Sequence, residues 1–118
     1  MQISDETRQA ILGALNALSQ RVDMGLTAPQ ILAVLTEEGV QFFENDPNDE
    51  SELFSALSRT GVRKAVATVC MWADRTIDIP SMALRRFLLS LCPENDQALL
   101  ILQGETQLIA RPLAACIS

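Results

Sequence analysis

Apolar positions recur at helical spacing over the first part of the chain. They are Ile11, Leu15, Leu18 and Val22, at intervals of four, three and four residues. This spacing places them on one stripe of an amphipathic helix. Ser4 and Asp5 precede the stripe as capping residues, and Gly25 follows it where a left-handed cap is favoured. The pattern therefore predicts a first helix that ends near Gly25.

A second helix is predicted between Thr27 and Gly39. Thr27, with Gln30 three residues later, has the form of a capping box, and Pro29 is tolerated in a first helical turn. The apolar face of this helix would be Ile31, Leu32 and Leu35. A short apolar connection follows it, consisting of Val40, Phe42 and Phe43.

Two further helices are predicted on either side of Gly61. Asp49 and Glu52 can form a capping box for a third helix, which Gly61 closes. Its buried residues would be Leu53, Phe54 and Leu57. The inward side of a fourth helix would be Val62, Val66, Val69, Cys70 and Ala73. Valine disfavours a helix because its side chain loses rotamer freedom there.

The last third of the chain predicts a fifth helix and leaves a choice for the sixth. Pro80 breaks the chain, and Ser81 caps a fifth helix with the apolar face Leu84, Phe87, Leu88 and Leu91. Pro93 can start a sixth helix. Residues Ala98 to Ala110 read either as one helix weakened by Gly104 or as a β-hairpin. The helix is favoured, because a hairpin would leave a lone two-stranded ribbon.

Short helices with short links predict an all-α fold, a compact bundle or orthogonal array of about five to six helices. A length of 118 residues is typical of one domain, so residues 1–118 are expected to fold as a single unit. The acidic N-terminal residues are unlike a signal peptide. Three cysteines far apart in the sequence favour reduced thiols over a disulfide framework. The expected location is the cytoplasm, with no membrane association.

Residues that carry common enzyme chemistry are missing from the sequence. There is no histidine, which removes the usual general base and most zinc sites. The five glycines fall singly, so no phosphate-binding loop is present. The acidic segment also fails as a calcium loop that begins at Asp46, because Ser51 and Leu57 occupy its sixth and twelfth positions. These absences predict a protein that is not an enzyme and holds no metal or cofactor.

Charge is distributed unevenly, and this suggests a partner. The net charge is −6, and ten of the 15 acidic residues precede Val62. The most polar stretch, Glu44 to Glu52, holds five acids in nine residues. We expect this segment to dock on a basic surface of a protein partner, with an apolar anchor beside it. The candidate partner-binding residues are Phe42, Phe43, Glu44, Asp46, Asp49, Glu50 and Glu52.

The leading functional hypothesis is thus a non-enzymatic cytosolic interaction or regulatory module with an acidic docking segment. The alternative is a nucleic-acid-associated regulator that uses basic residues of the C-terminal half, such as Arg63-Lys64 and Arg85-Arg86. The negative net charge makes nucleic acid an unlikely partner. A homodimer is plausible, because symmetric dimers are common among small proteins.

Four strings resemble small enterobacterial proteins of the YoaC type. They are GLTAPQIL (Gly25–Leu32), EEGVQFFENDP (Glu37–Pro47), ELFSALSRTGV (Glu52–Val62) and LCPENDQALL (Leu91–Leu100). The resemblance implies a compact helical bundle and a cytoplasmic setting. It supplies no catalytic or binding residues.

Overall fold

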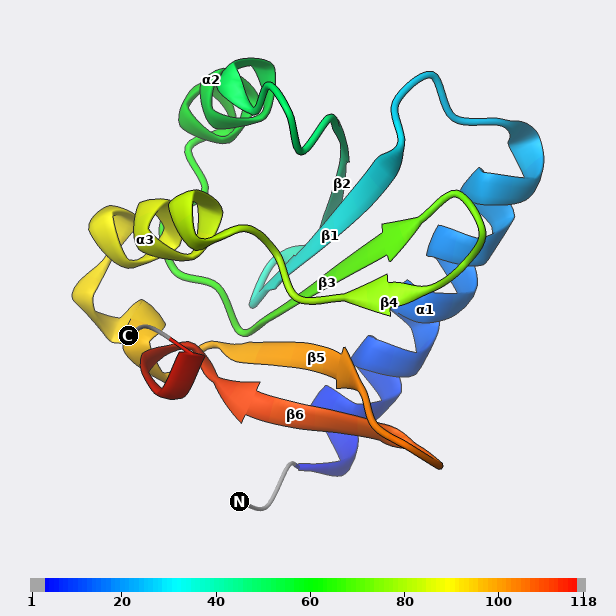
Figure 1. Cartoon of the computed structure of the whole chain (residues 1–118). Helices are drawn as coiled ribbons and strands as arrows, with labels where there is room; N and C mark the ends of the chain where they lie inside the picture. Colours follow the sequence, from blue (N-terminus) through cyan, green and yellow to red (C-terminus); the bar gives the residue numbers. More distant parts are fainter. Residues whose placement is uncertain (1–3, 117–118) are drawn as a thin grey trace.

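The chain folds as a mixed β-sheet between helices, and the all-α prediction is wrong. The computed structural model describes residues 4–116. The helices are α1 (Asp5–Met24), α2 (Ser51–Thr60) and α3 (Met82–Leu91), with short 3-10 helices η1 (Pro93–Gln97) and η2 (Leu113–Cys116). The strands are β1 (Gln30–Thr36), β2 (Gly39–Asn45), β3 (Ala67–Trp72), β4 (Ile77–Asp78), β5 (Leu99–Gln103) and β6 (Leu108–Pro112). In Figure 1, α1 lies on one side of the sheet, and α2 and α3 lie on the other.

The strand order across the sheet is β2-β1-β3-β5-β6, and β4 pairs with the end of β3. Neighbouring strands are antiparallel except β3 and β5, which run parallel. The parallel pair is joined through α3, which crosses one face of the sheet. This is an α/β architecture with a helical layer on each face.

Residues predicted as the second helix form β1 and its turn. Ile31 and Ala33 pack in the core on the α1 side, while Leu32 and Val34 pack in the core with α2 and α3. Because both faces of the strand are covered, its sequence is a continuous apolar run with no polar alternation. Such a run cannot be distinguished from a buried helix by periodicity. The apolar connection that follows this segment is strand β2.

Residues predicted as the fourth helix form a loop and β3. Val69 faces the α1 side, and Cys70 faces the α2 and α3 side. Valine packs well on a pleated, covered strand, which accounts for the weak helical signal noted in this stretch. The prediction of a helix here is therefore wrong, and the propensity of its residues is the physical reason.

The C-terminal segment forms the β-hairpin, which was the less favoured of the two alternatives that the sequence left open. Pro93 begins only the short η1 helix, and the stretch from Leu99 to Pro112 pairs as β5 and β6. The objection to a hairpin was that two strands alone are unstable. It fails because Ala67 and Val69 of β3 pair with β5, so that the hairpin extends an existing sheet.

The first, third and fifth predicted helices are confirmed as α1, α2 and α3. The Oγ atoms of Ser4 and Ser81 accept hydrogen bonds from the amides of Thr7 and Leu84, each at 3.1 Å. Gly61 ends α2 in the left-handed conformation, with φ at 74°. Within residues 4–116, the helices are too short or too polar to cross a membrane.

Candidate functional site

Polar side chains form a row across three strands at the end of the sheet where α2 and α3 begin. Asn45, Gln30 and Trp72 are register partners on β2, β1 and β3, so their side chains share one face. Gln30 and Asn45 are 5% and 4% exposed. The Asn45 amide nitrogen donates to Gln30 Oε1 at 3.0 Å. The sheet thus presents a row of polar groups, two of them buried, at one end of this face.

Glu50 links this row to both helices. Its Oε2 accepts a hydrogen bond from Asn45 Nδ2 at 3.0 Å, and its Oε1 accepts one from Ser81 Oγ at 2.5 Å. Glu50 is the N-cap residue of α2, and Ser81 is that of α3. A carboxylate is favoured there because the positive ends of two helix dipoles are close to it.

The Oδ1 atom of Asn45 is buried and has no hydrogen-bond partner among the described residues. A buried amide oxygen without a partner costs free energy, and native proteins satisfy nearly all such atoms. The nitrogen of the same amide is fixed by two acceptors, Gln30 and Glu50. The open position is therefore an acceptor, and it is suited to an N–H or O–H donor of a bound molecule.

Trp72 and Asp78 lie at the other end of the row. The Trp72 indole Nε1 donates to Asp78 Oδ2 at 3.0 Å, which fixes the plane of the half-buried ring. Cys70 lies on the same strand face. Burial raises the pKa of the Cys70 thiol to about 12, and the carboxylates of Asp78 and Glu50 act in the same direction. Cys70 is therefore a buried thiol that is poorly suited to act as a nucleophile.

The acidic segment is mostly used for local structure. Asp46 Oδ1 accepts from the Asn48 amide at 2.9 Å, and Asp49 Oδ1 accepts from the Ser51 hydroxyl at 2.7 Å and from its amide at 3.2 Å. The bonds from Ser51 lower the pKa of Asp49. Glu52 is exposed on α2. The segment after β2 is therefore a folded turn before α2, and Glu50 is the one acid of the segment that enters the polar cluster.

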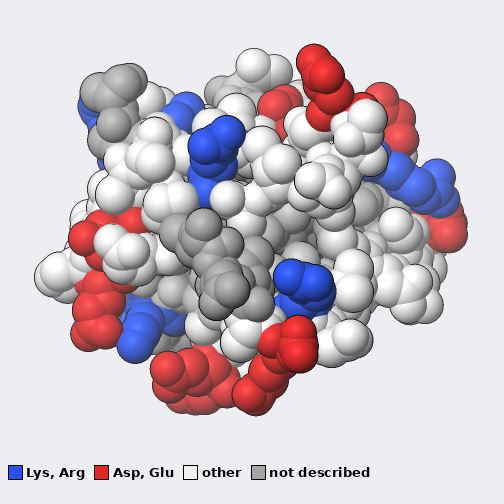
Figure 2. Space-filling model, turned by 90° about the horizontal axis from the view of Figure 1, so that it is seen from below, with Lys and Arg blue, Asp and Glu red and all other residues white. Residues whose placement is uncertain are grey.

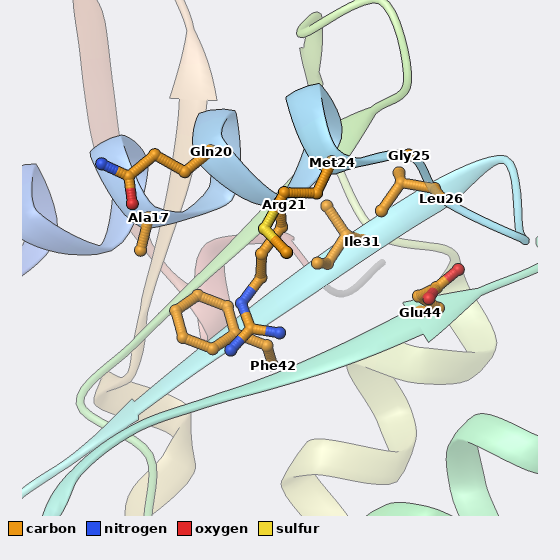
Figure 3. Close-up of a pocket in the computed structure, with 9 residues that line it drawn as sticks. All are labelled: Ala17, Gln20, Arg21, Met24, Gly25, Leu26, Ile31, Phe42 and Glu44. Carbon is orange, nitrogen blue, oxygen red and sulfur yellow. The ribbon is translucent and has the colours of Figure 1, made fainter.

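The remaining candidate residues lie on opposite faces of β2. Phe43 packs in the core with α2 and α3, whereas Phe42 packs on the α1 side. Glu44 is on the Phe42 face, and there it lines a hollow of about 570 Å³ together with Arg21 (Figure 3). The two phenylalanines cannot act together as one apolar anchor, because the strand separates them.

One residue of each basic pair in the C-terminal half is bound to other groups of the chain. Lys64 Nζ lies 3.1 Å from Glu94 and 3.8 Å from Glu37, and Glu94 and Glu37 raise the pKa of Lys64. Arg85 donates to the carbonyls of Pro80 and Cys116. Figure 2 shows basic side chains well separated and interspersed with acidic ones on the lower face. A continuous basic surface of the kind that binds duplexes is not visible there.

Sequence reasoning named Glu50 but missed the residues around it. Gln30 was assigned to a helix cap, Ser81 was recognised only as a cap, and Asn45 was not noticed. The available signal was a polar residue before the apolar run ILAVL, which is Gln30, and another after the segment VQFFE, which is Asn45. Only the strand pairing brings these ends together. Among residues 4–116, no group of three or more histidine, cysteine or carboxylate side chains is placed to hold a metal.

Comparisons with known proteins show a likeness to a solved structure. The chain resembles a glutamate-to-glutamine mutant of cytidine deaminase from Mycobacterium tuberculosis, with a TM-score of 0.58 and 19% identity. The match covers 86% of this chain and 89% of the deaminase chain. No profile of a protein family matches the sequence, and no curated protein matches it either. The likeness establishes the fold.

This likeness overturns the functional hypotheses drawn from the sequence. The chain was expected to be a non-enzymatic helical interaction module, or else a nucleic-acid-associated regulator. It instead has an α/β fold similar to that of the cytidine deaminase. The expectation that the chain is not an enzyme rested on the missing histidine, and the likeness in fold to a cytidine deaminase contradicts it. The homodimer stays a prediction.

Proposed function

We propose that this chain recognises a pyrimidine nucleoside at the polar cluster between the sheet and the first turns of α2 and α3. The observation that carries this function is the 2.5 Å contact between Glu50 and Ser81. It joins Glu50, before α2, to Ser81, before α3, and these two segments resemble the two short motifs of zinc deaminases. A shared fold alone would not be sufficient, because one fold supports many functions.

Zinc deaminases carry two short motifs, His-x-Glu and Pro-Cys-x-x-Cys, in which the glutamate is the general acid and base. Before α2 this chain has Asn48–Glu50, which reads Asn-Asp-Glu, and at the start of α3 it has Pro80–Leu84, which reads Pro-Ser-Met-Ala-Leu. The glutamate and the proline of the motifs are kept. Asn48, Ser81 and Leu84 stand at the three positions of the metal ligands.

These residues do not fit a zinc ion. Structural and catalytic zinc sites use thiolate, imidazole or carboxylate ligands, and the three positions offer an amide, a hydroxyl and an alkyl group. Leu84 is 1% exposed and belongs to the core. The oxygen of Ser81 is already bonded to Glu50 and to the Leu84 amide. The cluster therefore acts through its own hydrogen-bonding groups.

Three features of the cluster support a nucleoside as the ligand. The ring of Trp72 offers a flat surface for stacking a base, an interaction that every base can make. Glu50 accepts hydrogen bonds from ring or exocyclic N–H groups and can exchange a proton with a bound molecule. The open Asn45 Oδ1 can accept from a sugar hydroxyl or from a base N–H. Together they match a molecule with an aromatic plane and several donors.

A cytoplasmic setting is part of the same proposal. Cys70, Cys92 and Cys116 are all free thiols, which is usual for proteins of a reducing compartment. Nucleosides are small soluble metabolites, so no membrane contact is needed for their recognition.

The test uses the indole of Trp72, because the chain has one tryptophan. Cytidine and uridine are titrated into the protein while indole fluorescence and the indole N–H resonance are recorded. We expect saturable changes with both nucleosides and none with ribose. The absence of a saturable change with either nucleoside at millimolar concentration would refute the proposal.

A pair of glutamate variants locates the binding. Glu50→Gln should weaken the nucleoside about tenfold or more, since an anionic acceptor is lost. Glu52→Gln is the matched control, because Glu52 is exposed on α2, and it should bind as the unmodified protein does. Equal affinities of the two variants would contradict a role for Glu50. Ammonia release from cytidine is measured in the same samples, and release that Glu50→Gln abolishes would support the assignment.

A further inference from the structure

The hollow on the α1 side of the sheet is separate from the cluster around Glu50. Its lining comes from the C-terminal half of α1, the loop after it, and strands β1 and β2. Phe42 and Glu44 face this side, while Phe43 faces the other core. Its volume of about 570 Å³ is within the range of small-molecule sites.

Arg21 supplies a positive charge in a fixed position. Its guanidinium lies over the ring of Phe42, 4.2 Å from the ring centroid, and the cation–π attraction holds it there. Among residues 4–116, the ion pairs involve Lys64 and Arg75, so Arg21 has no carboxylate partner. A guanidinium that is fixed and uncompensated is suited to a carboxylate, which it can bind with two hydrogen bonds.

Glu44 supplies a negative charge that is equally fixed. Its Oε1 accepts three hydrogen bonds, from the Thr27 amide at 2.7 Å, the Thr27 hydroxyl at 2.8 Å and the Ala28 amide at 2.9 Å. Partial burial opposes ionisation, but the bonds from Ala28 and Thr27 outweigh it and hold the pKa of Glu44 below its ordinary value. All three bonds go to one oxygen, which leaves Oε2 for a ligand.

Apolar side chains lie between the two charges. Ile31 is the register partner of Glu44 and is 2% exposed, so it forms the floor. Leu26 and Met24 line the rim, and Met24 is 86% exposed despite its apolar side chain. Figure 3 shows Arg21 above Phe42, Glu44 farther along β2, and Ile31 between them.

The geometry points to a binding site for a free α-amino acid with a large apolar side chain. The carboxylate of the ligand would bind Arg21, its ammonium group would bind Glu44 Oε2, and its side chain would cover Ile31 and contact Met24. A phosphate ester or a fatty acid would meet the charge of Glu44, and a simple amine would leave Arg21 without a partner. A zwitterion satisfies both charges.

The probes for this site are L-leucine, L-leucinamide and N-acetyl-L-leucine. The amide lacks the carboxylate, and the acetylated compound lacks the ammonium group. We expect leucine to shift amide resonances at the end of α1 and on β2 in a saturable way, with an affinity at least tenfold above that of either analogue. Equal shifts with leucine and leucinamide, or no saturable shift, would overturn the inference.

Variants of Arg21 separate binding from folding. Arg21→Gln changes an exposed helix position and should remove the preference for leucine over leucinamide, while Arg21→Lys should retain part of it. Arg59→Gln, at an exposed position of α2, should leave the preference unchanged. If Arg21→Gln keeps the full preference, the site is wrong. The indole of Trp72 reports the nucleoside separately, so failure of one assignment does not affect the other.

Discussion

The side-chain oxygen of Asn95 accepts a hydrogen bond from the main-chain amide of Ala65 at 2.8 Å, across thirty residues of sequence. The amide nitrogen of Asn95 donates to the carbonyls of Arg63 at 2.6 Å and Leu88 at 2.7 Å. Asn95 is fully buried. One side chain therefore fixes the loop before β3 against the end of α3.

Replacing Asn95 should be strongly destabilising. Asn95→Ala removes three buried hydrogen bonds and leaves their partners unsatisfied, so we expect a loss of about 2–4 kcal/mol. Urea denaturation monitored by circular dichroism measures this loss in the free energy of unfolding. Asn16→Ala, at an exposed position of α1, should change the free energy of unfolding by less than about 0.5 kcal/mol. Similar losses in the two variants would contradict the role given to Asn95.

Two glycine-to-alanine changes should have opposite signs. A Cβ at Gly104 would lie 2.5 Å from the carbonyl oxygen of Gln107 in the β5–β6 turn, so Gly104→Ala should destabilise by about 1–3 kcal/mol. Gly13 lies within α1 with open space around it, and Gly13→Ala should stabilise by about 0.5–1 kcal/mol. Thermal unfolding measures both, and a gain at Gly104 would argue against the hairpin.

The three helices were predictable because their signals are local. Ser4 and Ser81 cap the N-termini of α1 and α3, and Gly61 ends α2. Each of these capping signals depends on neighbours a few positions away in the sequence. The strands were not predictable in the same way. β1 and β3 are apolar on both faces, so their pattern lacks the alternation that marks a half-buried strand. Their pairing depends on segments more than thirty residues apart.

The candidate site was only partly predictable for the same reason. Glu50 was noticed as one acid in a run of acids, which gives no hint that it differs from Glu52. The difference arises from strand pairing, which brings Asn45 beside Gln30, and from the crossover that places Ser81 opposite Glu50. No local spacing in the sequence encodes these contacts.

Loss of the Ser81 hydroxyl should cost more than loss of an ordinary helix cap. Ser4→Ala removes the cap of α1 and an exposed hydrogen bond to the Thr7 hydroxyl, and we expect a loss of about 1 kcal/mol in the free energy of unfolding. Ser81→Ala removes a cap and also the bond to the Glu50 carboxylate, so we expect about 2–3 kcal/mol. Urea denaturation compares the two variants. Equal losses would mean that the contact with Glu50 contributes nothing to stability.

The three thiols should differ in reactivity. The thiolate is the reactive form, and a pKa of about 12 keeps Cys70 protonated at pH 8. Cys92 and Cys116 are only half-buried. Iodoacetamide at pH 8, followed by peptide mass spectrometry, should therefore modify Cys92 and Cys116 and leave Cys70 free until the protein is unfolded. Early modification of Cys70 in the folded protein would be inconsistent with its burial.

Metal removal should have no effect on the folded protein. In the proposed match to the deaminase motifs, Asn48, Ser81 and Leu84 stand at the positions of the zinc ligands, and none of them supplies a thiolate or an imidazole. Protein purified without chelator should contain far less than one zinc per chain by elemental analysis, and EDTA should not change its melting temperature. Stoichiometric zinc would show that other residues hold the ion.

Because β3 pairs in parallel with β5, the sheet cannot be completed during synthesis until β5 has left the ribosome. When β3 leaves the ribosome, β1 and β2 are already available, but β5 follows only after α3 and η1. Until then the side of β3 that β5 will cover is open along residues 67–69, and this open edge could pair with another chain. A nascent chain that stops before Leu99 should therefore depend on chaperones, whereas the addition of the final hairpin should release it.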